Sequence, residues 1–173
     1  EHDDWFDSVF EDTTEIGALL GIEIDRIYFS GFSSQGDGAC FEGVYRYRKG
    51  WRAGIKDWIG GPDLPVILDI GERLQEIQRR YFYSIEASVS HHGRYCHEHC
   101  TDIRVTMPDH PSEGYWNDIS DDQKEIEDVL RDFMRWIYRA LEREYDHLTS
   151  DEVVAESLEA NGLEFEEDGT LVP

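Results

Sequence analysis

Sulfur and imidazole side chains are concentrated in the run HHGRYCHEHC, from His91 to Cys100. Zinc is held in proteins by four nitrogen or sulfur ligands in a tetrahedron, and thiolate with imidazole is a common set. The candidate metal ligands are Cys96, His97, His99 and Cys100. Their spacing departs from the familiar CxxC and HxxxH pairs, and a strand here would point the two cysteines away from the two histidines. A polar hairpin with solvated histidines and a redox disulfide between the two cysteines are the alternatives.

A second candidate is the small polar loop SSQGDG, from Ser33 to Gly38. A phosphate-binding loop would need a lysine or a following helix N-terminus, and a calcium loop would need several carboxylates. This loop offers one carboxylate, on Asp37, and a strand is expected after it. We interpret it as a hairpin turn in which Gly36 and Gly38 permit positive φ and Asp37 bonds to the turn backbone. Gln35 and Asp37, at the tip, are the expected contact residues for a partner protein.

Catalytic signatures such as GxSxG, HExxH and a Walker-type phosphate loop are absent from the sequence. We therefore expect a protein that is not an enzyme, with no catalytic residues and with no cofactor apart from the zinc ion considered above. The run YRYRKGWR, residues 45–52, is a local basic cluster that also contains aromatic residues. It could bind a small anionic ligand, or its charges could offset the acidic helices within the chain.

Acidic residues dominate the composition, because 39 aspartates and glutamates oppose 16 lysines and arginines and give a net charge of −23. The excess lies at the two ends: residues 1–25 contain nine acids and no lysine or arginine, and residues 118–173 contain eighteen acids and five bases. Phosphates would be repelled, which argues against nucleic acid and anionic membranes as direct partners and favours a protein with a basic surface. The expected partner-binding faces comprise Asp7, Glu11, Asp12 and Glu15; Asp121, Asp122, Glu125, Asp128 and Asp132; and Glu164, Glu166, Glu167 and Asp168.

Hydrophobic periodicity predicts the elements that position these residues. Helical spacing predicts helices over about residues 4–20 and 65–81, and a capping box at Ser120–Gln123 predicts the start of a long helix that ends near 148. Ser150 is expected to cap a last short helix. Alternating apolar residues predict four strands. The expected fold is one α+β domain over residues 1–173, a four-stranded antiparallel sheet of two hairpins packed against the long C-terminal helix and shorter helices, with 162–173 as a loose tail or edge strand.

Four segments carry a family resemblance: IYFSGFSSQGDGACFEG, IQRRYFY, DFMRWIYRALEREYDHLTSDE and LEANGLEFEEDG. Over about residues 10–170 the chain resembles small acidic proteins that phages and prophages encode and that are labelled as antitoxins of toxin–antitoxin systems or as antirestriction-type proteins. The motif SGFxSQGDGAxF is the most specific part of this resemblance. The resemblance implies a role against bacterial defence, in the bacterial cytoplasm, and it transfers no catalytic site.

Charge and resemblance together predict a phage-encoded inhibitor that binds a CRISPR effector, a restriction enzyme or a toxin, through acidic mimicry of nucleic acid. The alternative is a zinc-binding protein or metal-dependent enzyme centred on residues 96–100. The longest apolar runs fall short of the roughly 18 residues that a membrane span needs, and a basic signal-peptide segment is lacking. Three cysteines are an odd number, which favours a reducing compartment such as the host cytoplasm. Homo-oligomerisation is left open.

Overall fold

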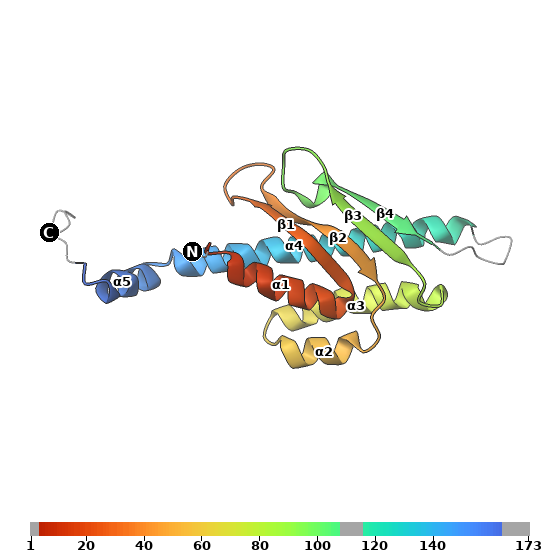
Figure 1. Cartoon of the computed structure of the whole chain (residues 1–173), viewed down its shortest axis with the longest axis horizontal. Coiled ribbons are helices and arrows are strands. Elements are labelled where there is room, and N and C mark those ends of the chain that lie inside the picture. Colours follow the sequence, from red (N-terminus) through yellow and green to blue (C-terminus); the bar gives the residue numbers. More distant parts are fainter. Residues whose placement is uncertain (1–3, 108–115, 164–173) are drawn as a thin grey trace.

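A four-stranded antiparallel sheet forms one layer of the molecule (Figure 1). The computed structural model describes residues 4–107 and 116–163. Strands pair in the order β1 (Ile22–Ser30), β2 (Gly38–Arg46), β3 (Glu86–His91) and β4 (Thr101–Thr106). The expected α+β class is confirmed: the β1–β2 and β3–β4 hairpins are joined by antiparallel pairing of β2 with β3.

Helices form the second layer. Their bounds are α1 (Asp7–Leu20), α2 (Trp51–Trp58), α3 (Asp63–Arg80), α4 (Trp116–Leu148) and α5 (Asp151–Ala160), with a short 3-10 turn, η1 (Glu98–Cys100), just before β4. Figure 1 shows α4 crossing beneath the sheet, with α1 and α3 beside it and α5 beyond the sheet. None of the described helices combines the length and the apolar composition that a membrane span requires.

The apolar stripe of α4 fills the space under the sheet. Ile126, Leu130, Phe133 and Ile137 recur at helical spacing and are fully buried. Phe133 meets Phe41 of β2 edge-on, with ring centroids 6.0 Å apart. Truncating such a side chain to alanine typically costs about 2–5 kcal/mol. This layer therefore fixes the sheet on α4 and leaves one side of α1 to solvent.

Two helix starts differ from the prediction. The helix start predicted at the Ser120 capping box is wrong, because α4 begins at Trp116 and Ser120 lies inside the helix. Helix α3 begins at Asp63, and Pro65 falls in its first turn, where a missing N–H costs nothing. The expected cap of α5 is confirmed, since the Ser150 hydroxyl accepts a hydrogen bond from the Val153 amide at 3.4 Å.

Strand β3 also starts later than its apolar alternation predicts. Phe82 and Tyr83 have positive φ, 54° and 61°, a conformation that bulky residues rarely adopt. The Gln78 side chain holds this turn in place, because its Nε2 donates to the Ile85 carbonyl at 2.8 Å and its Oε1 accepts from the Ile85 amide at 3.1 Å. The chain therefore turns after α3 and enters the sheet only at Glu86.

Candidate functional site

Helix α1 separates its polar and apolar residues cleanly. Ile16 and Leu20 are buried against the sheet and the other helices. Glu11, Asp12 and Glu15 are exposed on the opposite side, and none of them forms an ion pair with any residue that the structure describes. These three carboxylates are therefore charges without an ion-pair partner in the described part of the fold.

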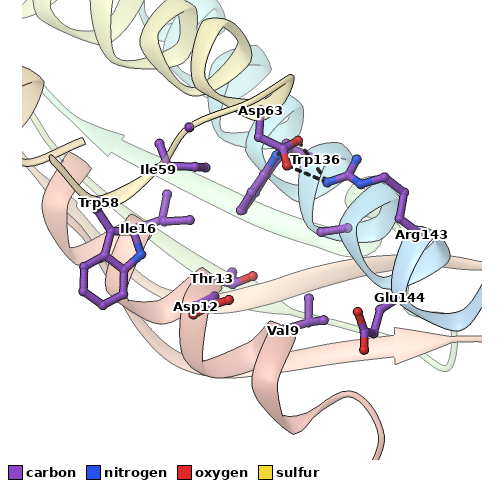
Figure 2. Close-up of a pocket in the computed structure, with 12 residues that line it drawn as sticks. Val9, Asp12, Thr13, Ile16, Trp58, Ile59, Asp63, Trp136, Arg143 and Glu144 are labelled. Atoms are coloured by element: carbon purple, nitrogen blue, oxygen red, sulfur yellow. Dashed lines mark hydrogen bonds and ion pairs between the residues drawn. The ribbon is translucent and has the colours of Figure 1, made fainter. Parts of the chain in front are cut away.

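A cavity of about 540 Å³ opens on one side of these carboxylates, between α1, the α2–α3 connection and α4 (Figure 2). We call it the α1–α4 pocket. Its lining residues are Val9, Asp12, Thr13, Ile16, Trp58, Ile59, Gly60, Asp63, Trp136, Ala140, Arg143 and Glu144. Figure 2 shows Trp58 at one end of the pocket and Arg143 with Glu144 at the other. An aromatic ring and carboxylates on facing walls suit a cationic group that carries an apolar stem.

Asp63 fixes one wall of the α1–α4 pocket. Its Oδ1 accepts a hydrogen bond from the Trp136 indole at 2.9 Å, and Arg143 donates to both of its oxygens, at 2.9 and 2.8 Å. The start of α3 is thereby tied to two positions of α4 that lie about two helical turns apart. On the α1 side of the pocket, the Thr13 hydroxyl is buried without a hydrogen-bond partner among the described residues.

A second cavity of about 650 Å³ lies on the other side of α1, against β1. We call it the α1–β1 pocket. It is lined by Phe10, Glu11, Asp12, Thr14, Glu15, Ile24, Asp25, Arg26, Ile27 and Trp58. The two pockets share Asp12 and the exposed ring of Trp58. Together they present six carboxylates against two guanidinium groups, so the surface formed by Glu11, Asp12, Glu15, Trp58 and the two pockets, which we call the α1 face, is strongly negative.

The acidic residues of α4 are placed differently from those of α1. Asp122 is only 8% exposed, and its two oxygens accept hydrogen bonds from Arg80 at 2.5 Å and from the Tyr81 hydroxyl at 2.8 Å. Arg73 of α3 is 2.7 Å from Glu125 and 2.6 Å from Asp132. Three of the five predicted partner-binding carboxylates of α4 therefore join α3 to α4.

The other predicted acidic positions divide as follows. Asp121 is exposed, and Asp128 lies 3.7 Å from Arg131 on the same helix. Asp7, in the first turn of α1, accepts the Asp4 amide at 2.9 Å and so stabilises the start of the helix. Glu164, Glu166, Glu167 and Asp168 lie outside the described residues.

The polar loop between β1 and β2 is a turn closed by its own aspartate. Asp37 Oδ2 accepts the amides of Ser33 at 2.8 Å and Ser34 at 2.6 Å, as the sequence predicts. Gly36 has the expected positive φ, 104°. Gly38 does not, and its role is different: a Cβ there would lie 2.9 Å from the Cys96 carbonyl oxygen. The glycine lets the two hairpin loops touch, while Gln35 stays exposed at the tip.

The histidine- and cysteine-rich run forms a 3-10 turn where a strand was considered. His97, Glu98 and His99 bring one nitrogen or oxygen atom each within 4.8 Å of one another, whereas Cys96 and Cys100 do not belong to this group. Glu98 was absent from the predicted ligand set, although its place between two histidines was a usable signal. Burial raises the pKa of the Cys96 thiol, which disfavours its thiolate form.

Residues of the basic run 45–52 are buried or paired with other parts of the folded chain. Tyr45 and Trp51 are buried. Arg46 pairs with Glu86 at 3.0 Å, Arg48 donates to the Ala18 carbonyl, and Arg52 pairs with Glu72. The internal-offset interpretation of this run therefore matches the geometry better than an anion-binding face.

Residues 5–151 match a family described as "Domain of unknown function (DUF8835)". The chain belongs to this family. The DUF8835 region contains α1, the sheet and α4, and therefore both pockets and both hairpin loops; it ends at the first residue of α5. Searches among curated proteins and among solved structures found no match.

Proposed function

We propose that this DUF8835 protein is a non-enzymatic, phage-encoded inhibitor that acts against bacterial defence. Its partner is a bacterial protein with a basic surface, such as a CRISPR effector, a restriction enzyme or a toxin, in the host cytoplasm. The α1 face is the contact surface. Nucleic acid and anionic membranes are not direct partners, because the net charge of −23 repels both.

The observation that carries this proposal is the unpaired charge of α1. A folded chain gains little from Glu11, Asp12 and Glu15, which make no ion pair with the described residues. The exposed ring of Trp58 stands between the two pockets beside them. Tryptophan is among the residue types enriched in binding hot spots. A lysine or arginine side chain of a partner could place its charge among these carboxylates and its stem against Trp58.

Charge reversal on α1 tests the contact surface. The variant Glu11→Lys/Asp12→Lys/Glu15→Lys should weaken binding to the partner by roughly 100-fold or more, because like charges placed across an interface cost several kcal/mol. The matched control is Glu152→Lys/Glu156→Lys/Glu159→Lys on α5, which changes the net charge by the same amount at exposed sites. Calorimetric titration against a panel of purified effectors, restriction enzymes and toxins measures both affinities.

Salt and competition test the mechanism. Wild-type affinity should fall steeply between about 0.05 and 0.5 M salt, since surface charges are screened over a few ångströms at the higher concentration. A partner that releases its nucleic acid on binding supports mimicry, whereas a stable ternary complex contradicts it. Equal losses in the α1 and α5 variants would overturn the assignment of the α1 face and leave only the overall charge as the attraction.

A further inference from the structure

The 3-10 turn η1 contains a buried carboxylate, on Glu98, with fewer hydrogen-bond donors than its two oxygens could accept. Among the described residues, Glu98 and Asp122 are the buried acidic side chains. Both oxygens of Asp122 have a donor, Arg80 and Tyr81. Within residues 4–107 and 116–163, the only hydrogen-bond donor to Glu98 is Arg135, which reaches Oε1 at 3.3 Å and also pairs with Asp132. Glu98 Oε2 faces the Nδ1 atom of His97 instead, at 3.1 Å.

One tautomer of His97 leaves a lone pair on Nδ1, where it faces the backbone of this turn. Nδ1 accepts a hydrogen bond from the His99 amide, with a nitrogen–nitrogen distance of 3.3 Å. A nitrogen that accepts a hydrogen bond carries a lone pair and no proton. In that tautomer Nδ1 cannot donate to Glu98 Oε2, which lies 3.1 Å away, and a cation that replaced the His99 amide at the Nδ1 lone pair would satisfy both atoms.

His99 brings a third candidate ligand atom near the same carboxylate. Its Nε2 is 4.0 Å from Glu98 Oε1, and its ring stacks beside that of His97 with centroids 5.3 Å apart. Zinc bonds of about 2.0–2.2 Å in a tetrahedron put neighbouring ligand atoms about 3.4 Å apart. Ligand atoms that all lie within 4.8 Å of one another therefore need only small side-chain rotations to close on one ion.

Charges around the turn also favour a cation. Two guanidinium groups, those of Arg73 and Arg135, serve four carboxylates, those of Asp69, Glu125, Asp132 and Glu98. Carboxylates therefore outnumber guanidinium groups in the salt-bridge network from α3 through α4 to η1. Arg139 lines the same pocket as Arg73 and Arg135, which leaves an excess of one negative charge that a cation at the η1 end would offset.

We propose that His97, Glu98 and His99 form a zinc-binding site, with water completing the tetrahedron. Imidazole nitrogen and carboxylate oxygen are ligands that zinc accepts, and three protein ligands leave one position open. Arg135 fixes the Glu98 carboxylate by holding Oε1 and leaving Oε2 to the ion. The site uses no cysteine and is independent of the proposed partner-binding function, since it lies outside both pockets of the α1 face.

Zinc titration of the full chain, freed of any affinity tag and of metal, tests the site. Wild type should bind one equivalent, and His97→Gln/His99→Gln should weaken binding at least about tenfold. The matched control, His92→Gln/His147→Gln, removes two histidines outside the cluster and should bind like wild type. Binding of less than a tenth of an equivalent to wild type, or equal loss in both double variants, would overturn the proposal.

Cobalt in place of zinc reports which atoms bind and needs no variant. A spectrum of tetrahedral cobalt without thiolate charge-transfer absorption is expected from nitrogen and oxygen ligands. An intense thiolate band would place Cys96 or Cys100 on the metal and would contradict the His–Glu–His assignment.

Discussion

Aspartates in this protein have two different roles, joining helices or facing solvent, depending on whether a hydrogen-bond donor lies within about 3 Å of the carboxylate. Asp132 pairs with Arg73 and Arg135 and so joins α3 to α4, whereas Asp12 faces the solvent between two pockets. Burial alone would raise the pKa of Asp132, but the hydrogen bonds from the two arginines outweigh it and lower the pKa below its usual 3.8. Asp132 therefore contributes to stability only while it is ionised.

The pH dependence of stability should reveal this carboxylate. A group whose pKa is depressed by folding stabilises the native state above its unfolded pKa, and this contribution is lost as the pH falls through the folded pKa. Asp132→Asn should lower the unfolding free energy at pH 7 by about 1–3 kcal/mol, the usual effect of removing a hydrogen-bonded charge. The difference from wild type should shrink below about pH 4, as measured by urea unfolding between pH 7 and pH 2.5.

Asp128→Asn is the control for that experiment, because Asp128 lies 3.7 Å from Arg131 on the same helix surface and has no partner on another described element. It should cost no more than about 0.5 kcal/mol at any pH. A constant difference between wild type and Asp132→Asn across the whole pH range would show that the aspartate acts through shape rather than charge.

Local partners of a side chain can be predicted from sequence, and distant ones cannot. The bonds of Asp37 reach amides three and four residues away, and a turn with glycine at Gly36 makes them the natural outcome. Asp122, Glu125 and Asp132 were predicted to face a partner protein. Their contacts within the chain, Arg73, Arg80 and Tyr81, lie on or just after another helix, far away in the sequence. Nothing in the local pattern distinguishes these carboxylates from Asp121, which is exposed.

At the scale of elements, α2 and α3 are locked by a glycine. Gly71 lies inside α3, and a Cβ there would approach the ring of Trp51 to 2.2 Å. Trp51 is buried, and its indole donates to Gln75 at 2.7 Å, so it cannot step aside. The close approach of the two helices therefore depends on the absence of one methyl group.

Gly71→Ala should destabilise the protein, against the trend for glycine in helices. Alanine normally stabilises a helix interior by about 1 kcal/mol relative to glycine, but overpacking a core typically costs about 1–3 kcal/mol, and a contact this short lies at the upper end. Thermal melting should fall by several degrees. Gly60→Ala is the control, because a Cβ there meets nothing within 4 Å, and its melting temperature should be unchanged.

Apolar periodicity predicts whether a segment is a helix or a strand. It does not predict where the segment begins, because that depends on contacts with distant residues. The stripe from Ile126 to Leu141 predicts α4 because every member is buried. The alternation at Tyr83 and Ile85 predicts a strand, yet Gln78 from the preceding helix pins a turn there. The 3-10 turn η1 (Glu98–Cys100) was missed for the same reason: a 3-10 segment of three residues has no period to detect.

At the scale of the whole molecule, α5 stands apart from the core. None of its residues is buried, and the family match ends at its first residue, Asp151. Eight of the acids and none of the lysines or arginines follow Ser150, so removing residues 151–173 would change the net charge from −23 to −15.

Truncation after Ser150 should leave the fold intact. The melting temperature should stay within about 2 °C of that of the full chain, since exposed positions rarely contribute more than about 0.5 kcal/mol. Partner affinity should fall at low salt and match that of the full chain at high salt, because the lost charges act only at long range. A melting temperature lowered by ten degrees would show that α5 packs on a surface it does not bury here.

The contact between the two hairpin loops offers a route for linkage between the zinc site and any partner contact that extends from the α1 face to Gln35. Gly38, beside the loop that carries Gln35, touches the backbone of Cys96 and His97 in the other loop. Linkage is reciprocal, so if a partner held at Gln35 changes the zinc affinity by some factor, zinc changes the partner affinity by the same factor. The concentration of free zinc in the cell would then set how long a partner protein stays bound.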